Sequence, residues 1–113
     1  MELYVGTRTK DQACIIDIEG EVDLYSSPTM RQYILDAMKQ HRPQILIVEL
    51  SRVTYMDSSG IATLVEGLQL ANEYHSRFKL VGLSRIVLEV FQLARLERVF
   101  SMYATEEEAL QDT

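Results

Sequence analysis

The richest chemistry in the sequence lies in the five residues Met56-Asp57-Ser58-Ser59-Gly60. An apolar run ends before this segment and an amphipathic pattern follows it, so both serine hydroxyls are expected at the start of a helix. The first N–H groups of a helix have no backbone partner, and the helix dipole places about half a positive charge there. This end of a helix stabilises a phosphate, so Ser58 and Ser59 are candidate modification sites.

A phosphate at this junction would act on a binding surface rather than on the fold. An unmodified serine costs little there, because Asp57 or Ser58 can cap the helix by accepting from a backbone N–H. Phosphorylation would add a charge of about minus two, although Asp57 and Asp23 would oppose it. A docked partner would then meet a desolvated and repelled charge, so binding would be switched off without unfolding.

Four acidic residues form the other candidate cluster, namely Glu19, Glu21, Asp23 and Asp57. Carboxylates close to a serine can bind a divalent metal or act as a general base. The alternative is a solvated loop in which Gly20 makes the turn after the second strand, with Asp57 as a helix cap. Both interpretations stay open at this point, and we favour the loop.

Other catalytic and cofactor patterns are missing from the sequence. His41 and His75 each lie near the end of a predicted helix, where the dipole favours a histidine. The chain has no Cys or His cluster at metal-ligand spacing, no glycine-rich phosphate loop and no Gly-x-Ser-x-Gly segment. We therefore expect a protein that is not an enzyme and that has no catalytic residues, no metal and no cofactor.

Length and charge narrow the class of protein further. The 113 residues suffice for one hydrophobic core, so residues 1–113 are expected to form a single domain. With 11 basic and 17 acidic residues the formal net charge is −6, which disfavours nucleic acid and anionic lipid as partners. The single Cys14 lies in an apolar run and is expected to be buried, and we find neither a leader pattern nor a membrane-spanning run. These features indicate a cytoplasmic protein that does not insert into membranes.

Strands and helices are predicted to alternate along the chain. Strands are expected at residues 3–7, 13–18, 44–50, 79–83 and 98–103. Helices are expected after the caps Ser27, Asp57 or Ser58, Ser84 and Thr105, the first with Pro28 at its start and the last with Glu108 completing a capping box. Strands joined through helices are usually parallel, so the order predicts an α/β fold whose mixed sheet has an antiparallel first hairpin.

Three of the predicted helices carry an apolar stripe that we assign to the core. The stripe residues are Met30, Tyr33, Ile34, Ala37 and Met38 in the first helix, Ile61, Leu64, Val65, Leu68 and Ala71 in the second, and Ile86, Val87, Val90, Phe91 and Ala94 in the third.

From Ile15 to Leu110 the sequence resembles STAS domains, specifically the stand-alone bacterial anti-sigma factor antagonists (anti-anti-sigma factors) of the sporulation and general-stress systems. The matching segments are Gly20-Glu21-Val22-Asp23, Ser27-Pro28, residues 45–50 and residues 55–61. The resemblance implies a mixed sheet of four to five strands, with about four helices packed mainly on one face. The chain departs from the family pattern at Leu24-Tyr25 and at Ala62-Thr63.

The resemblance also implies regulation by partner switching. Ser58 matches the serine that, in this family, is phosphorylated by an anti-sigma factor that is also a serine kinase. The unphosphorylated protein binds that kinase and frees a sigma factor, and a serine phosphatase restores the phosphorylated protein. The resemblance gives Asp23 a role in phosphorylation or kinase contact, and the expected partner-binding surface consists of Asp23, Asp57, Ser58, Ser59 and Gly60.

Two alternatives remain at the level of sequence. The chain could be a STAS subunit of a membrane lipid-transport ABC complex, where the domain is a constitutive structural partner of the transporter ATPase. The start of the helix could also bind a nucleotide or small anion, although Tyr55 is the closest aromatic residue and no basic clamp adjoins the motif.

Overall fold

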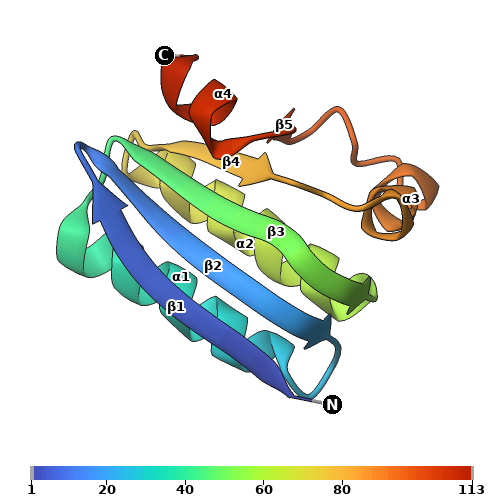
Figure 1. Cartoon of the computed structure of the whole chain (residues 1–113). Coiled ribbons are helices and arrows are strands. Elements are labelled where there is room, and N and C mark those ends of the chain that lie inside the picture. Colours follow the sequence, from blue (N-terminus) through green and yellow to red (C-terminus); the bar gives the residue numbers. More distant parts are fainter. Residues whose placement is uncertain (1, 113) are drawn as a thin grey trace.

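A computed structural model describes residues 2–112, whose strands form one five-stranded sheet (Figure 1). In chain order the elements are β1 (Leu3–Lys10), β2 (Ala13–Val22), α1 (Ser27–His41), β3 (Ile45–Met56), α2 (Ser58–Glu73), β4 (Arg77–Val81), α3 (Arg85–Leu93), β5 (Ser101–Tyr103) and α4 (Glu106–Gln111). The strands lie side by side in the same order as in the sequence. β1 pairs with β2 antiparallel and the other three pairs are parallel, which confirms the predicted mixed sheet.

The handedness of the crossovers explains why most helices share one face of the sheet. α1, α2 and α3 each connect two neighbouring parallel strands, and the strand order always advances in the same direction. Because such connections are right-handed, all three helices must lie on the same side. Residues of all three helices contribute to one hydrophobic cluster with the sheet, as Met30, Leu64 and Phe91 illustrate. α4 follows the last strand, so this rule does not constrain it.

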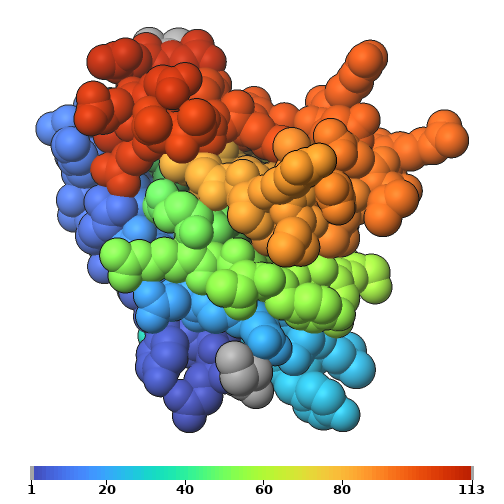
Figure 2. Space-filling model, turned by 45° about the vertical axis from the view of Figure 1, so that its right-hand side comes forward, coloured from blue at the N-terminus to red at the C-terminus, as the bar shows by residue number. Residues whose placement is uncertain are grey.

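The sheet is buried on both faces at one end and on a single face at the other. Cys14, Ile16 and Ile18 of β2 point into the large cluster beneath α1 and α2, whereas Ile15 points to the opposite face. There α4 covers a smaller cluster through Ala109. Burial raises the pKa of the Cys14 thiol, as expected for a structural cysteine. In Figure 2 the C-terminal segment, in red, lies over one end of the sheet, while the neighbouring blue and green strands reach the surface.

Several predicted boundaries were wrong by a few residues. β1 and β2 extend to Lys10 and Val22, so the turn between them consists of residues 11–12 and not of the predicted residues 8–12. Gly20 does not make a turn: it lies inside β2 with a φ of 116°. A Cβ atom at this position would lie 2.3 Å from the carbonyl oxygen of Glu2. The glycine therefore allows β1 to pass close to an irregular part of the strand.

The helix predictions were correct in kind but not in every residue. Ser26, not Ser27, is the N-cap of α1, and Ser27 is buried in the first turn. Ala94, the C-cap of α3, is exposed although we expected it in the core. Tyr33 and Ile86, which we also expected in the core, are 38% and 62% exposed. Each lies at the edge of its apolar stripe, where the sheet no longer covers it. Ser84 and Thr105 do cap α3 and α4 by accepting from the N–H groups of Val87 and Glu108.

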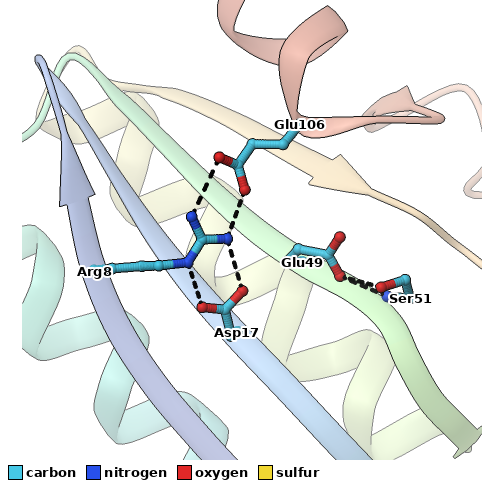
Figure 3. A network of polar contacts seen from close by, with 5 residues as sticks. All are labelled: Arg8, Asp17, Glu49, Ser51 and Glu106. Carbon is cyan, nitrogen blue, oxygen red and sulfur yellow. Dashed lines mark hydrogen bonds and ion pairs between the residues drawn. The ribbon is translucent and has the colours of Figure 1, made fainter.

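Two basic side chains attach α4 to the sheet. The Arg8 guanidinium bridges two carboxylates, with Nε 2.6 Å from Asp17 and Nη2 2.5 Å from Glu106 in the first turn of α4 (Figure 3). Lys79 is 3% exposed, and its ammonium group donates to the carbonyl oxygen of Ala109 at 2.6 Å and to that of Asp112. These bonds satisfy carbonyl groups that a helix end leaves unpaired. Burial lowers the pKa of Lys79.

We expect Arg8→Ala to lower the free energy of unfolding by about 1 kcal/mol, because two carboxylates lose a shared bidentate partner. Arg52 is a suitable control, since it makes a single exposed ion pair with Glu19 at 3.1 Å. Arg52→Ala should cost only about 0.3 kcal/mol. Urea denaturation at low and high salt measures both. Equal stability of Arg8→Ala and the unaltered chain at low salt would show that the bridge does not hold α4.

Candidate functional site

The candidate site lies where β2 and β3 end, at the same edge of the sheet. Val22 and Met56 are paired residues of these parallel strands. The backbone N–H of Asp57 donates to the Val22 carbonyl oxygen at 3.2 Å, which joins the loop before α2 to the end of β2. The segments that begin with Asp23 and Asp57 are therefore neighbours, as the sequence interpretation required.

Asp57 caps α2, as predicted. Its backbone is extended, with a φ of −114°, and its Oδ1 atom accepts from the Ser59 N–H at 2.9 Å. The same oxygen accepts from the Ser59 hydroxyl at 2.5 Å. Asp57 therefore satisfies one of the free N–H groups of the helix and also fixes the Ser59 side chain.

The two serines of the motif are in different environments. Ser58 is the first residue of α2 and is exposed, whereas Ser59 is half-buried and its hydroxyl is bound to Asp57. Among residues 2–112, the side-chain hydrogen bonds at this helix start join Ser59 and Asp57 and do not involve the Ser58 hydroxyl. Ser58 thus presents the hydroxyl that an external enzyme can reach.

Gly60 is buried, and its lack of a side chain is a steric requirement. A Cβ atom there would lie 2.7 Å from Cγ of Met56 and 2.8 Å from Cγ1 of Val22. The glycine lets the first turn of α2 approach the ends of β2 and β3 closely. Sequence reasoning assigned Gly60 to the partner-binding surface but did not predict this packing role.

The loop after β2 is ordered by Asp23 and Ser26. Oδ1 of Asp23 accepts from the N–H groups of Tyr25 and Ser26, both at 2.9 Å. The Ser26 hydroxyl accepts from the Asp23 N–H at 2.9 Å and donates to the Glu21 carbonyl oxygen at 2.7 Å. The backbone N–H of Ser26 and the other donors hold the pKa of the Asp23 carboxyl below its usual value. The sequence did not predict the role of Ser26, although an aspartate that accepts from the backbone N–H two residues further on is a common turn pattern.

Three of the four acidic residues make separate contacts. Glu19 pairs with Arg52, Asp23 orders its loop and Asp57 caps α2. Within residues 2–112, no group of three His, Cys, Asp or Glu side chains is arranged to hold a metal ion. In that same part of the chain, every helix is too short or too polar to span a bilayer.

The open face of the sheet carries a groove close to these strands. Its lining includes Tyr4, Gly6, Arg8, Glu49 and Ser51. Glu49 accepts from the Ser51 N–H at 2.8 Å and from its hydroxyl at 2.7 Å (Figure 3). In this groove Arg8 pairs with Asp17 and Arg52 pairs with Glu19, so most of its charged side chains already have a partner.

The fold and this helix start are those of a STAS domain, and the family model matches residues 4–109. The chain therefore belongs to the STAS domain family. It is 29% identical over 97 residues to the anti-sigma-B factor antagonist of Staphylococcus aureus, covering 86% of this chain and 89% of the relative. It is 26% identical over 111 residues to the anti-sigma-B factor antagonist of Bacillus subtilis, covering 98% of this chain and all (100%) of that protein. These names describe antagonists and not enzymes.

A solved structure of the anti-sigma factor antagonist SpoIIAA agrees with this assignment. In its unphosphorylated form it superposes with a TM-score of 0.81 at 28% identity, covering 95% of this chain and 93% of SpoIIAA. SpoIIAA of Bacillus has also been solved in its phosphorylated form, with a TM-score of 0.73 at 27% identity, covering 95% of this chain and 96% of that one. The resemblance inferred from the motifs is thus confirmed at the level of family and fold.

We expect Gly60→Ala to lower the free energy of unfolding by about 1–2 kcal/mol, because overpacking against Met56 and Val22 outweighs the gain in helix propensity. Gly6→Ala is the matched control, since nothing lies within 4 Å of a Cβ atom at Gly6. That variant should be as stable as the unaltered chain or slightly more stable. Urea denaturation compares the two, and equal effects would refute the packing role.

Proposed function

We propose that this protein is an anti-sigma factor antagonist controlled by phosphorylation of Ser58. The unphosphorylated form binds an anti-sigma factor that is also a serine kinase, and so frees a sigma factor in the cytoplasm. Phosphorylation of Ser58 ends this binding, and a serine phosphatase restores it. The observation that carries the proposal is the exposed Ser58 at the first position of α2. The hydroxyl of the neighbouring Ser59 already donates a hydrogen bond to Asp57.

The relatives support the same function. Two of them are named as antagonists of anti-sigma-B, and SpoIIAA exists in an unphosphorylated and a phosphorylated form. The match covers 100% of the Bacillus subtilis antagonist and 93% of the solved SpoIIAA chain.

The geometry explains how the switch can act without unfolding the chain. Ser58 lies at the start of a 16-residue helix, whose unpaired N–H groups and dipole stabilise a phosphate. Its side chain is exposed, so modification disturbs no packing. The partner-binding surface that we propose contains Asp23, Asp57, Ser58 and Ser59, and the buried Gly60 supports it from beneath. A phosphate there places about two negative charges where the partner must exclude water.

Ser58→Ala is expected to abolish phosphate incorporation when the protein is incubated with its cognate anti-sigma factor kinase and ATP. Ser59→Ala, the neighbouring control, should still be phosphorylated, because Ser58 remains in place. Mass spectrometry of the intact chain and of its peptides gives the stoichiometry and the position. Phosphorylation of Ser58→Ala at the level of the unaltered chain would disprove the assignment.

Ser58→Asp is expected to weaken binding of the same kinase at least about tenfold, which corresponds to roughly 1.4 kcal/mol. Ser58→Ala should bind like the unaltered protein, since it adds no charge. Isothermal titration calorimetry measures both, and urea denaturation checks that each variant still unfolds cooperatively. Unchanged affinity of Ser58→Asp would rule out the charge mechanism. Stable co-purification with a transporter ATPase instead of a kinase would favour the lipid-transport alternative.

A further inference from the structure

Leu24 and Tyr25 form an exposed apolar pair beside the proposed switch. They are 69% and 90% exposed, which leaves two large adjacent side chains in water. Both lie in the loop between β2 and α1, the loop that Asp23 begins. Single exposed apolar residues are ordinary, but an adjacent pair at a functional edge indicates contact with another molecule.

The loop holds this pair in a defined position. The carboxylate of Asp23 accepts from the Tyr25 N–H at 2.9 Å, and the Asp23 carbonyl oxygen accepts from the Ser27 N–H at 2.8 Å. The Ser26 hydroxyl closes the turn between Glu21 and Asp23. Because the backbone is already ordered, binding through these side chains loses little conformational entropy.

The position of the pair places it in the same docking surface as Ser58. Asp23 directly follows Val22, and the N–H of Asp57 is bonded to the Val22 carbonyl oxygen. A partner protein bound over the start of α2 therefore lies next to the loop that carries Leu24 and Tyr25. Aromatic and aliphatic side chains that enter a pocket supply much of the binding energy of protein interfaces.

The surrounding charges indicate the chemistry of the partner. Glu21, Asp23 and Asp57 flank the pair and the helix start, and the segments 21–28 and 55–63 contain no basic residue. A partner protein with basic side chains around an apolar pocket would match this pattern. A second copy of this chain would bring the same acidic groups to the contact, so like charges would oppose self-association.

We propose that Leu24 and Tyr25 are specificity-determining docking residues, which insert into an apolar pocket with a basic rim on the protein that binds the Ser58 surface. This inference rests on the proposed function and adds to it the residues that select the partner.

The test compares Leu24→Ala/Tyr25→Ala with the matched pair Tyr33→Ala/Leu93→Ala. Tyr33 and Leu93 are 38% and 86% exposed and lie on α1 and α3, beyond the first turn of each helix. Binding to the purified cognate anti-sigma factor kinase is measured by calorimetry. We expect at least tenfold weaker binding for the loop pair, no change for the control pair, and weaker binding of the unaltered chain as salt is raised. Unchanged urea midpoints would show that both variants fold normally.

Three outcomes would overturn the proposal. The first is unchanged affinity of the loop variant while Ser58→Asp still weakens binding, which refutes this inference and leaves the proposed function intact. The second is an equal loss in both double variants, which shows that the loop is not special. The third is self-association of the unaltered chain in size-exclusion chromatography that the loop substitutions remove, which identifies a second copy as the occupant. Unchanged binding by Ser58→Asp would instead count against the proposed function itself.

Discussion

Val22 and Met56 end neighbouring parallel strands, and the hydrogen bond from the Asp57 N–H to the Val22 carbonyl oxygen joins the two chain segments that follow. Because of this contact, α2 begins next to the loop that Asp23 orders. Gly60 makes the approach possible, since any larger residue would press on the same two strand ends. The position of Ser58 is thus determined by backbone pairing and by close packing, and its own side chain contributes to neither.

The one-sided arrangement of the helices leaves the region of the proposed switch accessible. Right-handed crossovers place α1, α2 and α3 on one face, and each helix starts at the carboxyl edge of the sheet. Loops at that edge therefore gather the start of α2 and the loop before α1. On the opposite face, α4 covers one end of the sheet. It is held there by the packing of Ala109, by the hydrogen bonds of Lys79 and by the ion pair between Arg8 and Glu106. The functional edge and the C-terminal helix are held by separate contacts, so one can change with little effect on the other.

Patterns of sequence predicted most of the fold, because they reflect local physics. The period of apolar residues identified the elements, and the caps at Asp57, Ser84 and Thr105 follow from short polar side chains before an apolar stripe. The errors arise where long-range contacts decide. Gly20 allows the close passage of β1, and Lys79 is buried because α4 packs over it. These contacts join residues that are far apart in the chain, so no local sequence pattern can reveal them.

The candidate site, like the fold, could be predicted only in part from the sequence. The helix start and the cap could be predicted from Asp57-Ser58-Ser59-Gly60, but the residues alone did not distinguish the two serines, and only the family resemblance favoured Ser58. The structure adds a physical distinction, because one Asp57 oxygen accepts from both the N–H and the hydroxyl of Ser59. This cap occupies the second hydroxyl and leaves the first exposed.

The charges around Ser58 suit a phosphate that would act on another protein and not on the chain itself. The helix start favours an added phosphate by about 0.3–1 kcal/mol, whereas the acidic groups of Asp57 and Asp23 oppose it. The adjoining segments supply no arginine or lysine that would bind it to the chain's own surface. Because no basic side chain of these segments would neutralise it, a phosphate at the helix start stays exposed, and its charge acts on whatever approaches that surface. Since such an exposed charge is screened within about 10 Å at 0.1 M salt, the proposed switch would act only at direct contact with a docked protein.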